Sequence, residues 1–166
     1  MASILCAGIA VLDEVFRVSA FPLPDTKVQA SEFITIGGGN AATHVIFSAQ
    51  CLRAAARTDD LPLGLTHMAK LTDAFLAVTN GPHPVLWCDR SRATIRETPV
   101  FAVKAVDTLG AGDVFHGAFA LALVEGRGVE DALRFAAAAA GLKCSRFGGS
   151  AVAPRRAEVD ALLAQP

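Results

Sequence analysis

The sequence predicts a single α/β domain, and three patterns lead to this prediction. Ser3 to Val11 is a near-continuous apolar run that contains a glycine, which is typical of a strand buried on both faces of a parallel sheet. Glycines precede apolar helical stretches at Gly37 and again at Gly110. Val129 to Leu142 is an alanine-rich run that favours a closely packed helix. With 166 residues, 52% of them hydrophobic and 19% charged, the chain can form one substantial core.

Charge and cysteine content narrow the classes of partner. The formal net charge is −1 and there is no Lys/Arg cluster, so we expect no nucleic acid and no membrane as a partner, and small molecules instead. The four cysteines form no CxxC pair and have no histidine at zinc-ligand spacing, which predicts reduced, mostly buried thiols. The N-terminus lacks a basic signal segment and no apolar stretch is long enough to span a bilayer, so a cytoplasmic location is expected.

Asp13 follows the first predicted strand. In open α/β sheets the ligand crevice lies at the carboxyl ends of the strands, so a carboxylate here is well placed to bind polyol hydroxyls. The alternative interpretation is a solvated Asp-Glu turn. The stretch from Val15 to Ile36 then alternates in its second half, which predicts short extended segments of an exposed strand.

Gly37 to Gln50 carries glycines that lead into a predicted apolar helix. A glycine triplet before a helix is by itself a weak signal of ligand binding, and an N-cap role accounts for Asn40 without a ligand.

A strand and a hairpin are predicted in the middle of the chain. Ala74 to Thr79 is predicted as a buried strand, a loop follows to Pro84, and a second strand leads into a hairpin with the alternating segment Arg92 to Glu97. Trp87 is expected in the core, and His83 in an exposed loop.

The run from Asp107 to Phe119 places a carboxylate directly behind a glycine-rich turn at a helix start. Gly110 and Gly112 permit backbone angles that other residues resist, so successive N–H groups can converge on an anion that the helix dipole also favours. Asp113 would then lie in the first turn, within reach of a hydroxyl that it could deprotonate. The alternative is an ordinary turn with an acidic residue that stabilises the helix N-terminus.

These segments together resemble the two signatures of the PfkB family of carbohydrate and nucleoside kinases. GGGN at residues 37–40 is similar to the first signature, and DTLGAGDxFxGA at residues 107–118 is similar to the second. The resemblance implies a ribokinase-like three-layer αβα sandwich over residues 1–166, with a small β lid at about 15–36 that also forms a homodimer contact. It implies ATP-dependent phosphorylation of a hydroxyl on a sugar or sugar-like substrate, and GGGxAAT is similar to the branch of the sulfofructose kinases.

The resemblance also implies roles for single residues. Asp113 would be the general base, and the N–H groups of Gly110, Ala111 and Gly112 would form the anion hole. The acceptor would be held by Asp13, Gly38, Gly39 and Asn40, and the nucleotide would be bordered by Thr79, Gly81, Gly148 and Gly149. Mg²⁺ would bridge the phosphates, and a monovalent cation, K⁺, is expected near Asp107. His116 falls at a variable point of the signature and is not expected to act as a base.

The resemblance is incomplete. Members of the family are about twice this length, and the shortfall falls at an apparent internal deletion near residues 51–71. The family's N-x-x-E magnesium motif is absent, Pro84 replaces a glycine of the nucleotide loop, and Thr43 stands where an asparagine is frequent. A partial sequence, a real deletion and two chains that complete one another remain open explanations.

The alternative function is a catalytically impaired, non-enzymatic protein that derives from a kinase and serves in sugar or nucleotide binding or in oligomerisation. A dinucleotide-binding oxidoreductase is less favoured, because no G-x-G-x-x-G follows the first strand.

Overall fold

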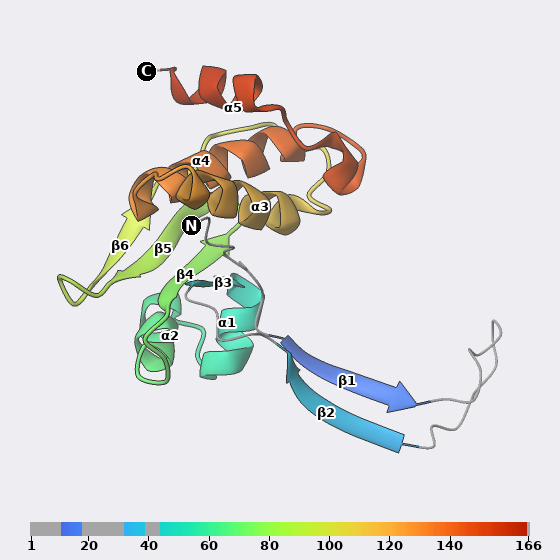
Figure 1. Ribbon diagram of the computed structural model, residues 1–166, viewed down its shortest axis with the longest axis vertical. Helices are drawn as coiled ribbons and strands as arrows, with labels where there is room; N and C mark the ends of the chain where they lie inside the picture. The colour runs from blue at the N-terminus through green and yellow to red at the C-terminus, as the bar shows by residue number, and fades with distance from the viewer. Residues whose placement is uncertain (1–10, 18–31, 39–43, 166) are drawn as a thin grey trace.

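The computed structural model describes residues 11–17, 32–38 and 44–165, the first two ranges as backbone alone (Figure 1). The strands are β1 (Val11–Arg17), β2 (Glu32–Gly38), β3 (His44–Ser48), β4 (Phe75–Asn80), β5 (His83–Asp89) and β6 (Thr94–Thr98). The helices are α1 (Ala49–Ala56), α2 (Leu61–Met68), α3 (Ala111–Val124), α4 (Val129–Cys144) and α5 (Arg156–Leu163), with a short 3₁₀ helix, η1 (Gly149–Val152), before α5.

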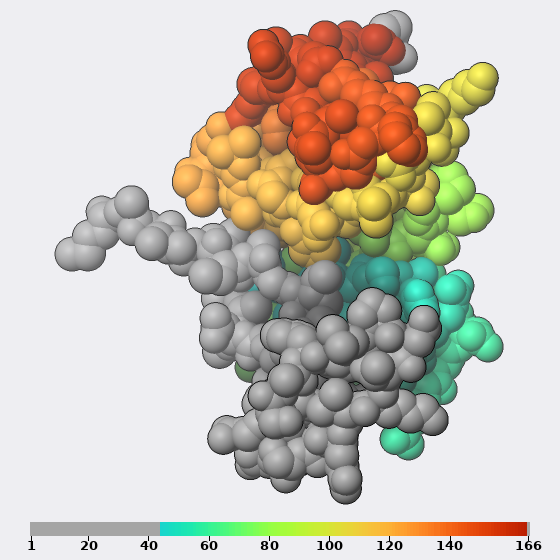
Figure 2. Space-filling model, turned by 90° about the vertical axis from the view of Figure 1, so that its right-hand side faces the viewer, coloured from blue at the N-terminus to red at the C-terminus, as the bar shows by residue number. Residues whose placement is uncertain are grey.

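A four-stranded mixed sheet forms the middle layer, in the order β3-β4-β5-β6. β3 runs parallel to β4, and the other two pairs are antiparallel. Successive side chains of β4 alternate between faces, so Leu76 and Val78 pack with α1 and α2 while Ala77 packs with α3 and α4. Figures 1 and 2 show the two helical layers on opposite sides of the strands. The predicted three-layer αβα arrangement is confirmed.

β1 and β2 form a separate two-stranded antiparallel sheet, with register from Val11 opposite Gly38 to Arg17 opposite Glu32. The sequence predicts an exposed strand in the second half of residues 15–36, and β2 confirms this prediction. The predicted end of the first strand at Val11 is wrong, because Asp13 lies inside β1 opposite Ile36. A backbone-paired hairpin accepts an Asp-Glu pair within a strand, since its pairing does not require both faces to be buried. The apolar run before Val11, with Gly39 and Asn40, lies outside the described residues.

The predicted helix directly after the glycines is wrong over His44–Ser48, which is strand β3. Its Val-Ile-Phe core consists of β-branched and aromatic residues that suit a pleated surface, and pairing with β4 buries Ile46 and Phe47. Short apolar runs do not distinguish a buried strand from a helix by periodicity. The helix begins later, at Ala49, where the Ser48 hydroxyl accepts a hydrogen bond from the Cys51 N–H at 3.1 Å.

The segment around residues 51–71 folds as a pair of helices on one face of the sheet. Arg57, in the left-handed conformation, is the C-cap of α1, and Asp60 is the N-cap of α2, where its carboxylate accepts from the Leu63 N–H at 2.9 Å. Leu52 and Leu65 are fully buried against the strands. This segment is therefore a packed layer, and the internal deletion stays a prediction.

The middle strands match the sequence predictions, except that β5 begins at His83, which is exposed as expected but lies in the strand and not in the preceding loop. β4 and β5 join through Gly81 (φ +58°) and Pro82, an arrangement that suits a tight hairpin turn. Trp87 is buried, and its indole N–H donates to the Thr98 hydroxyl at 3.1 Å. Of the three described cysteines, all free thiols, only Cys88 is buried, while Cys144 is partly buried and Cys51 is exposed, so the prediction of mostly buried thiols is wrong for those described. Within residues 44–165 and the two described strands, no helix is long and apolar enough to cross a membrane.

We predict that Leu65→Ala lowers the free energy of unfolding by about 2–5 kcal/mol, because the side chain is 0% exposed and its removal leaves a cavity under α2. Leu71→Ala is the matched control, since Leu71 is 77% exposed and its truncation should change the free energy by about 0.5 kcal/mol or less. Urea denaturation of both variants measures the difference. Equal effects would show that α2 is not packed on the sheet.

Candidate functional site

Several backbone N–H groups in the first turn of α3 have no recorded acceptor among the described residues. Gly110 is the N-cap with φ +76°, and no side chain caps the helix. The Ala111 N–H donates to the Thr108 carbonyl at 3.1 Å. Among the described residues, no acceptor is recorded for the N–H groups of Gly110, Gly112 or Asp113. In the described part of the chain, two of the three predicted anion-hole N–H groups thus lack a recorded acceptor, and the third is used within the turn.

Asp113 lies in the same first turn and its side chain is exposed. Within the described part of the chain, its carboxylate has no recorded hydrogen bond or ion pair. A carboxylate at a helix N-terminus is stabilised by the helix dipole. The first turn of α3 thus carries both backbone N–H groups and an exposed carboxylate on one helix.

His116 fixes this turn to the sheet. Its Nδ1 lies 2.7 Å from the carbonyl oxygen of Gly112, one turn earlier, and its Nε2 lies 3.2 Å from the carbonyl oxygen of Ile46 on β3. On the same helix, the side chains of Phe115 and Phe119 are buried in the hydrophobic core. The sequence analysis did not select His116 for this role, because the Ile46 contact joins residues 70 positions apart.

Asp107 connects the loop before α3 to the loop after α4. Its Oδ1 accepts from the Leu109 N–H at 2.9 Å, and its Oδ2 accepts from the N–H groups of Gly149 at 2.9 Å and Gly148 at 3.1 Å. The Lys143 ammonium lies 3.2 Å from the same Oδ2. The hydrogen bond from the Gly149 N–H is the largest cause that holds the Asp107 pKa well below its usual range, with Leu109, Gly148 and Lys143 adding to it.

The two loops also pack directly on one another. A Cβ at Gly110 would lie 2.8 Å from the backbone nitrogen of Ser150, and Gly148 and Gly149 both have positive φ, at +132° and +59°. The N–H groups of Val106 and Asp107 donate to the Cys144 carbonyl at the end of α4. The structure thus brings together four of the sequence-predicted residues: Asp107, Gly110, Gly148 and Gly149.

The other predicted residues lie elsewhere in the fold. Thr79 stands near the end of β4, where its hydroxyl donates to the Phe47 carbonyl at 3.3 Å, and Gly81 is in the exposed turn that follows. Thr79 and His116 are therefore anchored to adjacent residues of β3, Phe47 and Ile46. Asp13 and Gly38 belong to the β1–β2 hairpin, which the structure describes as backbone.

Lys143 is a residue of this region that the sequence analysis did not select. It is 0% exposed in the last turn of α4. Its position was readable from the helical period, because Ala136 and Ala139, seven and four residues earlier, lie on the same buried face. A lysine on such a face needs a partner, and here the partner is Asp107.

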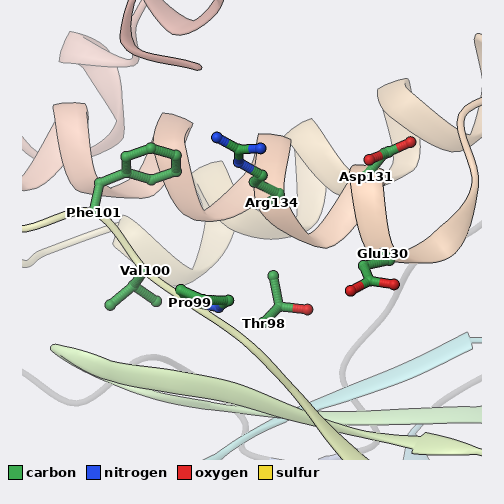
Figure 3. Close-up of a pocket in the computed structure, with 7 residues that line it drawn as sticks. All are labelled: Thr98, Pro99, Val100, Phe101, Glu130, Asp131 and Arg134. Carbon is green, nitrogen blue, oxygen red and sulfur yellow. The ribbon is translucent and has the colours of Figure 1, made fainter. Parts of the chain in front are cut away.

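A pocket of about 360 Å³ lies near the other end of α4 (Figure 3). Glu130, Asp131 and Arg134 line it from the helix, and the segment after β6, including Phe101, lines the other side. The Arg134 guanidinium lies 5.9 Å from the centre of the Phe101 ring. None of the sequence-predicted site residues lines this pocket.

We predict that Gly110→Ala destabilises the fold by more than the roughly 1–2 kcal/mol that a left-handed conformation costs a non-glycine residue. The added Cβ would also meet the Ser150 backbone. Gly126→Ala is the matched control, because Gly126 has φ +82° with open space around it. The decrease in unfolding free energy of this variant therefore measures the conformational cost alone. Equal losses in urea denaturation would contradict the close contact of the two loops.

We predict that Asp107→Asn lowers stability most at neutral pH. Because the folded-state pKa is lowered, the ionised carboxylate contributes fully above the ordinary pKa of about 3.9, and this contribution is lost as the pH falls through the folded-state value. The difference in unfolding free energy between wild type and variant should therefore shrink below about pH 4. Asp73→Asn, at an exposed position, is the control; a pH-independent difference for Asp107→Asn would argue against the hydrogen-bonded carboxylate.

Comparison with known proteins places this chain among sugar kinases. Residues 63–156 match the pfkB family carbohydrate kinases. The ribokinase of Bacillus subtilis (strain 168) is 43% identical over 101 residues, which are 61% of this chain and 34% of that protein.

Two solved structures show the same fold. The ribokinase of Arabidopsis thaliana, complexed with ribose and ATP, has a TM-score of 0.68 and 29% identity, covering 75% of this chain and 42% of that one. The fructokinase of Vibrio cholerae O395, bound to fructose, ADP and calcium ion, has a TM-score of 0.67 and 27% identity, covering 74% and 41%.

The chain spans about a third of the length of the first curated ribokinases it matches. The family match covers more than half of this chain, from within α2 to the start of α5, and includes the loop before α3. This chain therefore belongs to the pfkB family of carbohydrate kinases.

Proposed function

We propose that this protein transfers a phosphoryl group from ATP to a hydroxyl of a sugar-like substrate. The observation that carries the proposal is the start of α3, where the described residues supply no acceptor for the N–H groups of Gly110 and Gly112 and no recorded partner for the carboxylate of Asp113. The complex of the similar Arabidopsis ribokinase with ribose and ATP supports this choice of substrates.

The chemistry asks for positioning and charge stabilisation more than for covalent catalysis. The acceptor hydroxyl oxygen forms a bond to the terminal phosphorus of ATP while the bond from that phosphorus to the bridging oxygen breaks, and ADP leaves with that electron pair. Asp113 takes the proton of the hydroxyl. The N–H groups of Gly110 and Gly112 donate to the oxygens of the transferring group, on which negative charge is spread.

The remaining assignments are part of the same proposal. Asp13, Gly38, Gly39 and Asn40 would hold the acceptor, and Thr79, Gly81, Gly148 and Gly149 would border the nucleotide. The β1–β2 hairpin would serve as the lid that excludes water, and as the contact of a homodimer in the cytoplasm. The exposed turn at Gly81 and the positive φ values of Gly148 and Gly149 suit close approach of a ligand to the backbone.

Mg²⁺ is expected from the family, and the similar fructokinase binds a calcium ion. Among the described residues, no group of three His, Cys, Asp or Glu side chains could hold a metal ion. Mg²⁺ bound with a nucleotide is held mainly by phosphates and water and needs only one or two protein carboxylates. We therefore assign no described residue as its ligand, and no step of the proposed reaction passes through it.

We predict that Asp113→Asn lowers kcat by about 100- to 10,000-fold, because the amide cannot accept the hydroxyl proton. The KM for ATP should stay within about threefold, since the N–H groups that bind the phosphate are unchanged. Asp131→Asn is the matched control: Asp131 is also an exposed aspartate in the first turn of a helix, and its kinetics should equal wild type. ADP release against a panel of sugars, sulfosugars and nucleosides, with ATP binding by calorimetry, measures both.

Equal losses of binding and turnover in Asp113→Asn would contradict a role as base. Saturable ATP or sugar binding by the wild-type chain without any transfer would favour the alternative, a non-enzymatic binding protein of this family.

A further inference from the structure

Lys143 is a fully buried lysine whose recorded partners both belong to one residue. Its Nζ donates to the backbone carbonyl of Asp107 at 2.6 Å and lies 3.2 Å from the Asp107 Oδ2. The side chain of Lys143 is 0% exposed and that of Asp107 is 16% exposed. Removing an ammonium group from water is costly unless it is paired and hydrogen-bonded, so the position of Lys143 is tied to these two oxygens.

The two oxygens are also the kind of ligand that a monovalent cation takes. Carbonyl and carboxylate oxygens replace the hydration shell of K⁺ in proteins, and an ammonium group carries the same single charge. The family resemblance predicts a monovalent cation near Asp107. In the structure, the ammonium group of Lys143 lies at that aspartate.

The donor set around Asp107 does not fit a further cation. Oδ2 already has three donors, namely the N–H groups of Gly148 and Gly149 and the Lys143 ammonium. Oδ1 accepts from the Leu109 N–H. The single negative charge is balanced by the single positive charge of Lys143, so a second cation at this carboxylate would be an uncompensated charge beside a buried ammonium.

We propose that the Lys143 ammonium takes the place of the monovalent cation in this chain. It binds the loop before α3 and, through Asp107, holds Gly148 and Gly149 in position, so that folding and turnover do not depend on K⁺. The statement about turnover rests on the proposed kinase function, while the statement about cation binding and folding does not.

Thermal unfolding tests the proposal without any need for activity. A cation that binds the folded state would raise the melting temperature. Since we expect wild type to bind no K⁺ here, its melting temperature should agree within about 1 °C between KCl and choline chloride of equal ionic strength. Lys143→Gln removes the ammonium and opens the two oxygens, so it should melt lower in choline chloride and regain about 3 °C or more in KCl. Lys70→Gln, at an exposed position, removes the same charge and should show no response to K⁺.

Direct binding and kinetics complete the test. Thallium NMR, with Tl⁺ as the K⁺ probe, should detect no bound cation in wild type, and ADP release should agree within twofold between KCl and choline chloride. Bound Tl⁺ in wild type, or a wild-type melting temperature or turnover rate that rises with K⁺, would overturn the proposal. A folded Lys143→Gln variant whose melting temperature is the same in KCl and in choline chloride would also overturn it.

If Lys143→Gln does not fold in either salt, the wild-type comparison and Tl⁺ binding decide. Absence of turnover would count against the kinase function and would leave the melting and Tl⁺ measurements valid.

Discussion

The hydrogen-bonded carboxylate of Asp107 is the constraint on which the site depends. It joins the loop before α3 to a region about 40 residues later in the sequence, which comprises the end of α4 and the glycines at the start of η1. A buried lysine and three backbone N–H groups converge on it, and charged hydrogen bonds of this kind are stronger than neutral ones. Gly110 lies three residues after this aspartate, so the geometry of the helix start follows from the same contacts.

The sheet supplies the second constraint, because it fixes the position of α3 and therefore of the first turn that we propose as the anion site. Phe115 and Phe119 bury one side of the helix, and the imidazole of His116 ties the first turn to the Ile46 carbonyl of β3. The same strand, through the Phe47 carbonyl, accepts from Thr79. Pre-positioned groups require no reorganisation at the moment of reaction, which is why a rigid scaffold suits phosphoryl transfer.

The layer formed by α1 and α2 shows how burial decides local structure. The sequence from residue 51 onward is polar enough to suggest a junction, yet Leu52 and Leu65 cover the face of the sheet opposite to α3. The strand β3 forms for the same reason, since its two faces are covered by different helical layers and a helix at this position would leave β4 without a parallel neighbour. Packing against other elements thus overrides the weak local preference of a short apolar run.

The sequence by itself determined the α/β class, the helices α3 and α4, the β4–β6 strands and the glycine turn with Asp113, because these depend on local periodicity and turn chemistry. It also pointed to Asp107, Gly148 and Gly149 through a family resemblance. Tertiary structure alone decided that Asp107 accepts from glycines 41 and 42 residues away, that Lys143 is its partner and that His116 reaches β3. Such contacts join distant segments through the packing of layers, and no periodicity within a segment encodes which distant group its side chains will meet.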